Sequence, residues 1–353
     1  MKKILVLLFV LGTYYAGHAQ KLVGVGKMVQ GGVADGEKLL DAYLLPVNRA
    51  MIVGLNNSGF SGAYDSEDEH RFSLSLNMSL ISVPTADKTF NVNDLALESV
   101  EPKEPTHSIA QTAFGDSTSI KLVSKFGIGS VRYFSINTLE GSEQNALPLP
   151  YLQATYRPGK GTIGFQVIPP VILPKSDIRV WLAGANFYEN MEGVLPFMEA
   201  LPFDIYFGGG VFIFKGHSKL DVEPGDVKVN LPITNDTKGP YDNQELKIGY
   251  TGFYGTAYAT MKINIFTPFV GIGFNSGSST FDVIGTYPVY AKSPGSFIGI
   301  RAKDVENPIS SSSTYSRIKL EAGGRFDFGR FFAQASYTLA NYGGLGGSLG
   351  IRF

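Results

Sequence analysis

Five charged residues near the C-terminal end of the chain alternate with apolar ones. Between residues 317 and 328, charges of both signs occupy odd positions, and aliphatic or aromatic residues occupy most even ones. Successive strand side chains point to opposite faces, so this period of two predicts a strand with one wet and one apolar face. In a wet lumen the charges would line a pore or hold a plug by salt bridges, whereas in a narrow barrel they would only neutralise one another. These candidate pore-lining residues are Arg317, Lys319, Glu321, Arg325 and Asp327.

The sequence gives little indication of a catalytic histidine. His107 and His217 fall in or beside predicted loops, and His70 precedes a predicted strand in an acidic run. A catalytic histidine needs an orienting acid and a nucleophile or water within hydrogen-bond reach. A run of acidic residues beside a strand is more typical of a solvated rim. We therefore expect no catalytic residue, and the chain is not expected to be an enzyme.

Other site chemistries also lack their residue patterns. Residues 24–27 resemble a phosphate loop but lack its spacing and its following Ser or Thr. The acidic run in 85–118 lacks the regular spacing of a calcium loop. The chain has no Cys, so thiolate metal sites and disulfides are excluded. Its net charge of -1 gives no basic excess for nucleic acid. We expect no metal, no cofactor and no nucleic-acid partner.

The alternating pattern recurs in other parts of the chain. Residues 72–80 alternate apolar residues with Ser and Asn, and the runs from 331 and from 345 repeat this to the terminal Phe353. Charged residues make up 17%, against about 25% in soluble domains. The pattern predicts an all-β protein, a transmembrane antiparallel barrel of about twelve strands within a range of about ten to fourteen. Further strand candidates are residues 119–126, 149–157, 162–168, 177–187, 203–215, 246–263 and 266–274, with loops at 85–118, 218–244 and 290–314.

The N-terminus predicts export. Lys2 and Lys3 precede an apolar run from Ile4 to Leu11, and small residues stand before a cleavage site after Ala19. The apolar run is shorter than the roughly 20 residues of a membrane-spanning helix. The predicted organisation is a signal peptide at 1–19, an N-terminal helical or plug segment at 20–66, and an outer-membrane barrel at 67–353.

The segment 20–66 does not alternate. Apolar residues from Val33 to Leu44 fit an amphipathic helix of about three turns that ends near Pro46. Gly54, Asn56 and Asn57 then predict turned or flexible backbone. Two alternatives remain open at this point. The helix lies in the periplasm beside a linker, or it folds into the barrel mouth as a plug.

The chain resembles known families in its last strand and in several internal motifs. The amphipathic end with Phe353 resembles bacterial outer-membrane barrels, in which the assembly machinery reads the terminal strand. The mature chain resembles an uncharacterised Bacteroidota family, domain of unknown function 6588. That resemblance implies a location and a fold but no activity. Its motifs are 39–44 with Pro46, 54–57, 147–150, and 168–174 with 177–179. A weaker likeness to fatty-acid-channel barrels rests on the N-terminal plug candidate.

Two functions follow as hypotheses. The first is an outer-membrane channel or transporter for small solutes, hydrophobic ones included, with the segment before residue 66 as its gate. The alternative is a closed structural or partner-binding barrel that works through its extracellular loops, as an accessory subunit of a secretion or uptake complex. Lumen width discriminates them, since about eight to ten strands leave an interior filled by side chains whereas larger barrels enclose cavities. Expected partners are outer-membrane lipid, the barrel-assembly machinery and a small solute. Trp181 and the tyrosines are expected to lie at the membrane interfaces.

Overall fold

Ten antiparallel strands close into a barrel in the computed structural model, which describes residues 22–57, 60, 71–172, 178–193, 202–292 and 300–353. Around the barrel the order is β1-β21-β20-β19-β16-β15-β12-β11-β10-β9. The all-β barrel prediction is confirmed, and the strand number lies at the lower end of the expected range. The strands are β1 (Phe72–Ser82), β9 (Ala146–Tyr156), β10 (Gly161–Ile172), β11 (Arg179–Asn190), β12 (Asp204–Lys219), β15 (Glu245–Thr260), β16 (Phe266–Ile284), β19 (Ile309–Phe328), β20 (Phe331–Leu339) and β21 (Gly344–Arg352).

The period of two in the sequence sets the two faces of the barrel wall. In β1, Ser73 and Asn77 are buried in the interior, whereas Phe72 and Leu74 are exposed on the outside. In β19, Ile318 is 73% exposed although its neighbour Lys319 is only 1% exposed. The predicted faces of these strands are therefore confirmed.

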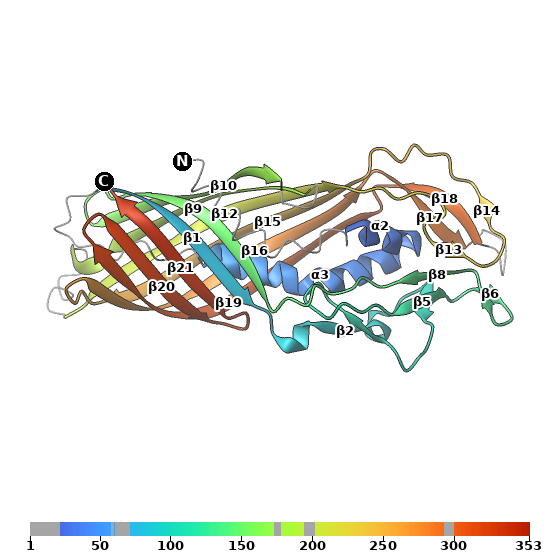
Figure 1. Cartoon of the computed structure of the whole chain (residues 1–353), viewed down its shortest axis with the longest axis horizontal. Helices are drawn as coiled ribbons and strands as arrows, with labels where there is room; N and C mark the ends of the chain where they lie inside the picture. Colours follow the sequence, from blue (N-terminus) through green and yellow to red (C-terminus); the bar gives the residue numbers. More distant parts are fainter. Residues whose placement is uncertain (1–21, 58–59, 61–70, 173–177, 194–201, 293–299) are drawn as a thin grey trace.

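The two ends of the barrel differ. At the turn end, short turns join β9 to β10 and β19 to β20, and the chain finishes there with Phe353. At the loop end, long connections at 83–145, 220–244 and 285–308 carry additional strands. β12, β15, β16 and β19 have 16, 16, 19 and 20 residues. A membrane crossing needs about 9 to 11. These four strands project beyond the others at the loop end (Figure 1).

Two helices lie within this framework. α2 (Leu22–Gln30) leads through Gly32, which has a φ of 130°, into α3 (Val33–Asn56). Figure 1 shows α3 along the interior, and it contacts β1, β9, β12, β15, β16 and β19. The helix thus occupies the lumen, as the plug alternative expects. None of the helices in the described ranges is long and apolar enough to span a membrane.

The predicted end of the helix near Pro46 is wrong. α3 continues for ten residues beyond Pro46, to Asn56, and includes Gly54, where turned backbone was expected. A proline inside a helix removes one backbone hydrogen bond. Packing against the surrounding strands outweighs that loss, since tertiary contacts rather than propensity stabilise most helices. Gly54 allows the close approach, because a Cβ there would lie 2.4 Å from Leu149 Cδ1.

The connections at the loop end form a folded cap over the projecting strands. Its strands are β2 (Thr89–Asn91), β3 (Val100–Pro102), β4 (Ile109–Gln111), β5 (Lys121–Ser124), β6 (Gly127–Ile128), β7 (Val131–Arg132), β8 (Phe134–Asn137), β13 (Lys228–Val229), β14 (Thr234–Asn235), β17 (Thr286–Lys292) and β18 (Ile300–Glu306). The expectation of a wall strand at 119–126 is wrong, because β5 pairs within the cap sheet β13-β8-β5-β3. The predicted loop 290–314 contains β18 and the start of β19.

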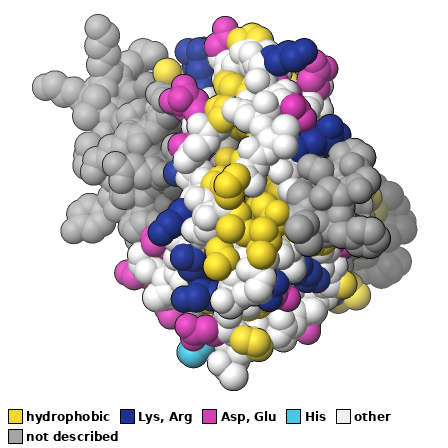
Figure 2. All heavy atoms as spheres, turned by 90° about the vertical axis from the view of Figure 1, so that its right-hand side faces the viewer, with side chains coloured by type: hydrophobic (Ala, Val, Ile, Leu, Met, Phe, Trp, Pro, Cys, Tyr) yellow, Lys and Arg dark blue, Asp and Glu magenta, His cyan; other side chains and the backbone are white. Residues whose placement is uncertain are grey.

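Three apolar clusters fill the interior. The first joins α2 and the start of α3 to the cap, and it includes Met28, Leu39 and Leu40. The second joins the C-terminal half of α3 to the wall. The third is an aromatic group around Phe60 near the turn end. Seen from the loop end, the cap surface has apolar side chains near its middle, with acidic and basic side chains intermixed around them (Figure 2).

Candidate functional site

The C-terminal end of α3 is fixed in the lumen by hydrogen bonds to the wall. The Lys319 ammonium group donates to the Asn56 carbonyl at 3.2 Å, and the Asn56 amide donates to the Ser276 carbonyl at 3.3 Å. A cation at a helix C-terminus also interacts favourably with the helix dipole. β16 and β19 therefore hold the last helical residue from one side.

Asn57, the residue after the helix, is held by two further strands of the same part of the wall. Its carbonyl accepts a hydrogen bond from the Ser79 hydroxyl at 3.2 Å, and its side-chain oxygen accepts one from Thr338 at 2.7 Å. Ser79 belongs to β1 and Thr338 to β20. Together with the Asn56 contacts, four strands thus fix the end of the plug.

Lys319 and Glu321 form an ion pair inside the lumen. Their charged atoms are 3.7 Å apart, and each side chain is 1% exposed. The Tyr258 hydroxyl donates to Glu321 at 2.6 Å, and the Lys319 ammonium lies 5.1 Å from the centre of the Tyr254 ring. A buried ion pair is tolerated only when such additional contacts compensate for lost solvation. The structure thus brings together two of the five predicted charges, and one of them binds the plug.

Phe60 fills the lumen between the C-terminal end of α3 and the turn end of the barrel. Its ring stacks on Tyr258 with centroids 4.2 Å apart, and Tyr188 and Tyr206 meet it edge-on at 5.3 Å. The side chain is fully buried. Sequence reasoning missed this residue. The available signal was a single aromatic residue within a run of Asn, Ser and Gly at 56–62.

Arg325 and Asp327 form a second charged group nearer the turn end. Arg325 Nε lies 3.0 Å from Asp327 Oδ1, and Arg352 Nη2 lies 3.3 Å from the same oxygen. The Arg325 guanidinium also lies 3.8 Å from the centre of the Phe332 ring, a cation–π contact. The interpretation of the sequence missed Arg352, because only strand register places the terminal strand beside this group.

Arg317 does not join the other charges. It is exposed, its guanidinium lies 5.4 Å from the centre of the Tyr315 ring, and it donates to the Ser316 carbonyl at 3.1 Å. β20 pairs with β19 only as far as Leu320, so β19 has no partner on that side at Arg317. Arg49 of α3 lies 5.8 Å from the same Tyr315 ring and pairs with Asp87 of the cap at 3.0 Å.

The lumen below α3 has a polar wall. A cavity of about 10 Å³ remains there, room for roughly one water molecule. Its lining residues are Phe60, Ser73, Ser75, Asn77, Gln153, Thr155, Arg325, Phe332, Gln334 and Ser348. The wall around the C-terminal half of α3 is apolar instead, and includes Leu149, Leu182, Phe212 and Phe214. Beyond the end of the helix the interior is thus polar beside β1, β9, β20 and β21, whereas Phe60 and its aromatic neighbours fill the side of β11, β12, β15 and β16.

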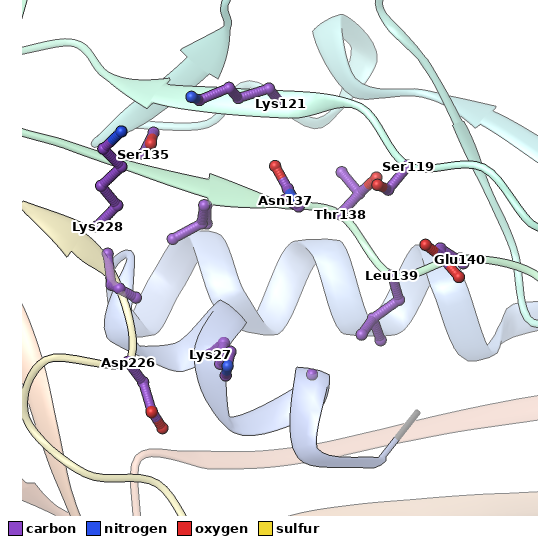
Figure 3. A pocket seen from close by; sticks show the side chains of 13 residues that line it. Lys27, Ser119, Lys121, Ser135, Asn137, Thr138, Leu139, Glu140, Asp226 and Lys228 are labelled. Atoms are coloured by element: carbon purple, nitrogen blue, oxygen red, sulfur yellow. The ribbon is translucent and has the colours of Figure 1, made fainter. Parts of the chain in front are cut away.

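A separate pocket lies in the cap. It has a volume of about 420 Å³ between α2, β5, β8 and the segment 226–228. In Figure 3, Lys121 and Lys228 extend toward the same end of the pocket, on either side of Ser135, and Lys27 comes from α2. Glu140 and Asp226 also line it, so the lining carries both signs of charge.

The remaining predicted residues lie away from the lumen. Phe353 exchanges two backbone hydrogen bonds with Phe72, at 2.8 and 3.3 Å, and so closes the barrel beside the β1–β21 pair. His107 pairs with Glu104 on the exposed cap, and His217 is exposed on the outer wall. His70 is outside the described residues. Within the described parts of the chain, no cluster of three or more His, Cys, Asp or Glu could hold a metal.

The family of the chain follows from comparison with known families. Residues 1–353 match the model described as "Family of unknown function (DUF6588)". The chain belongs to this family. The DUF6588 chain matched no curated protein.

Solved structures with some likeness to the DUF6588 chain are outer-membrane proteins. The attachment invasion locus protein Ail of Yersinia pestis is 11% identical, with 81% of this chain and 100% of Ail covered and a TM-score of 0.23. The toluene transporter TbuX of Ralstonia pickettii is 8% identical (87% and 98% covered, TM-score 0.20). The outer membrane protease OmpT of Escherichia coli is 8% identical (82% and 100% covered, TM-score 0.29). Scores this low say nothing about function, and the fold rests on the strand pairing itself.

Proposed function

We propose that this protein is a barrel of the bacterial outer membrane that conducts small solutes when α3 leaves the lumen. Membrane insertion is supported by a belt of exposed apolar side chains around the wall. On β12 the outward apolar positions run from Ile205 to Ile213, a length that matches the roughly 9 to 11 residues of one crossing. Other members of this apolar belt are Phe187, Phe253, Val270, Ile272, Phe274, Ile318, Leu320, Phe326, Leu339, Leu345 and Leu349.

The observation that carries the channel proposal is the polar wall below the plug. A barrel that is purely structural gains most from an apolar interior, because buried polar groups without partners cost free energy. Here Gln153, Asn186 and Asn275 are buried on the lumen side, and each has a side-chain polar atom without a protein partner among the described residues. Such groups suit a wall that water and polar solutes contact. The polar wall favours polar cargo and gives no support to a hydrophobic one.

The plug makes the closed state the resting state. Met51, Ile52, Val53 and Leu55 of α3 are at most 5% exposed within the second apolar cluster. Burial of one such side chain contributes about 1.5 to 3 kcal/mol, so withdrawal of four would cost roughly 6 to 12 kcal/mol. Conduction therefore needs an external trigger, such as a partner that binds the cap or the turn end.

A plug-weakened variant tests the proposal without knowledge of the trigger. Ile52→Ala with Leu55→Ala should lower the cost of withdrawal by about 4 to 10 kcal/mol. We expect a solute flux into vesicles that the native chain lacks. Leu345→Ala with Leu349→Ala, which removes the same kind of side chain from the outer face, is the matched control.

A cross-link provides the second arm. The chain has no Cys, and the Ser311 hydroxyl donates to Asp41 of α3 at 2.6 Å. Cysteines at both positions, joined by a short thiol cross-linker in the weakened variant, should pin α3 and abolish the flux. A folded weakened variant without flux would contradict the channel proposal.

The second candidate is a closed barrel that binds a partner through its cap. It is supported by the folded core of the cap, by the cap pocket of about 420 Å³ and by the ten-stranded wall, a width at which side chains fill the interior. Failure of the weakened variant to conduct would favour this function. Both candidate functions share three further proposals: cleavage of the signal peptide after Ala19, recognition of Phe353 by the assembly machinery, and an origin in Bacteroidota. Residues 1–19 lie outside the described part of the chain.

A further inference from the structure

A row of basic side chains crosses the outside of three neighbouring strands. Arg179 of β11 is paired with His217 of β12, which in turn is paired with Lys247 of β15. Lys215 stands two residues from His217 on the same face and is paired with Trp181. All four basic side chains are exposed.

The row lies directly beyond the apolar belt on the side of the loop end. On β12 the last apolar outward residue is Ile213, and Lys215 is the next residue on that face. On β16 and β19 the belt ends at Phe274 and Ile318, and the next outward residues are serines. The row of basic side chains thus lies on β11, β12 and β15 and does not continue onto β16 or β19.

Carboxylates balance only part of the positive charge of this row. Lys247 lies 3.4 Å from Glu245, and Asp282 is its cross-strand neighbour on β16. Arg179 and Lys215 have no ion pair with any residue in the described ranges. Lys215 is the diagonal neighbour of Arg179 across β11 and β12, and long side chains at such positions reach one another. An anion bound between these two side chains would neutralise both charges.

A groove is available for such an anion. It has a volume of about 380 Å³, and its charged or aromatic lining residues are Trp181, Lys215, His217, Lys247 and the carboxylate-bearing Glu245. Arg179 stands at the edge of the groove, across from His217. Tryptophan beside basic residues at the edge of an apolar surface is typical of the headgroup level of a membrane. This setting favours an anion that is attached to a lipid over one that is free in solution.

We propose that this groove binds the phosphorylated headgroup of a lipid in the leaflet at the loop end. Arg179 and Lys215 contact the phosphate, and the Trp181 ring packs on the uncharged part of the headgroup. The inference rests on the proposed membrane location of the barrel. It assigns a role in lipid binding to a surface outside the lumen, independent of what the barrel conducts.

The test uses the full chain in phosphatidylcholine vesicles doped with a diphosphorylated glycolipid. The variant is Arg179→Gln with Lys215→Gln. The matched control, Lys160→Gln with Arg330→Gln, removes two positive charges from turns at the opposite end. Glycolipid that stays bound after detergent extraction is counted by native mass spectrometry. Loss of two basic contacts should lower the apparent affinity about 10- to 30-fold, and the control should bind as the native chain does.

Each other outcome counts against the inference. Equal binding by variant and native chain would exclude the groove, and so would equal retention of a dephosphorylated glycolipid. Competition by millimolar inorganic phosphate that matches the lipid in affinity would identify a free-anion site instead. Flotation with the vesicles is measured first. A chain that does not float refutes the membrane proposal itself, whereas one that floats and keeps its lipid in the variant refutes only this inference.

Discussion

The Lys319 ammonium group donates a hydrogen bond to the Asn56 carbonyl, which is 263 residues away in the sequence. This contact joins the last turn of α3 to the wall of the barrel. Lys319 also forms an ion pair with Glu321. The Lys319 side chain thus connects the plug to the charged face of β19.

Replacing Lys319 by Met should strongly destabilise the protein. The substitution leaves the buried Glu321 carboxylate without its cation and removes the contact to the plug. Breaking a buried pair in this way costs about 3 to 5 kcal/mol of the free energy of unfolding. Urea unfolding in lipid vesicles, followed by the gel mobility of folded and unfolded chains, measures this loss.

A double variant separates charge from packing. Lys319→Met with Glu321→Gln should be less destabilised than the sum of the two single variants, because the unpaired carboxylate is gone. Additive losses would show that the ion pair does not operate as a unit. From the sequence alone, Lys319 was expected either to line a wet lumen or to be neutralised by other charges in a narrow one. In the structure it is buried and paired with Glu321.

Replacing Leu320 by Arg tests the outward face of the same strand. Leu320 belongs to the apolar belt, one outward position from its edge at Ile318, so an arginine there should cost more than about 1 kcal/mol but less than the roughly 2 to 4 kcal/mol of the bilayer midplane. Ser312→Arg is the control, since Ser312 shares that face of β19 beyond the belt. Its free energy of unfolding should change by no more than about 1 kcal/mol. If both variants lost the same free energy of unfolding, Leu320 would not lie in the apolar belt.

The faces of the strands could be predicted because apolar and polar residues alternate visibly within each strand. β1 and β19 show apolar and polar residues in strict alternation, and this local signal needs no knowledge of neighbouring strands. Lys319 and Glu321 were assigned to one face for the same reason. Their burial could not be foreseen, because it depends on what else fills the lumen.

The contacts of the plug could not be predicted from local patterns. α3 passes Pro46 only because surrounding strands support it, and no sequence window contains those strands. Arg352 reaches Asp327, and Phe60 reaches Tyr258, through the register of strands far apart in the chain. The types of residue in the sequence were enough to identify the charged face of β19. The residues that contact this face could be identified only from the pairing of strands in three dimensions.

Acid should release part of the cap through Asp304. Burial alone would raise the pKa of this carboxyl group, but the backbone N–H groups of Lys238 and Gly239 and the Tyr241 hydroxyl donate to it, and its pKa is lowered. A lowered pKa in the folded state stabilises the fold above the unfolded pKa, which is about 3.9. That stability is lost as the pH falls through the folded pKa.

Hydrogen exchange of the amides that bind Asp304 measures this effect. The Lys238 and Gly239 amides should be protected at pH 6 and should lose protection, after correction for intrinsic rates, as the pH falls below about 4. Asp304→Asn should show the loss already at pH 6. Constant protection in the variant would mean that the segment is held by other contacts.

Phe353 should matter more for assembly than for the stability of the folded barrel. Its two hydrogen bonds to Phe72 use backbone atoms, and its side chain is 59% exposed. Phe353→Ala keeps both bonds, so the free energy of unfolding should change by about 0.5 kcal/mol or less. The yield of assembled barrel in cells should fall clearly. A variant with a native yield would argue against recognition of this side chain, and deletion of residue 353 would then report only the lost backbone bonds.

Replacing Phe60 by Ala should leave a cavity in the lumen below α3. The ring contacts Tyr188, Tyr206 and Tyr258, and a large-to-small change at so buried a phenylalanine costs about 3 to 5 kcal/mol. The new space adjoins the polar cavity, so water should enter it and the Tyr188 and Tyr258 rings should become accessible to quenchers of tyrosine fluorescence. Phe72→Ala is the matched control. Phe72 stacks on Tyr156 at 4.8 Å, but it lies on the outer face and is 56% exposed. If both variants lost stability equally, Phe60 would not seal the lumen, and the plug would end at Asn57.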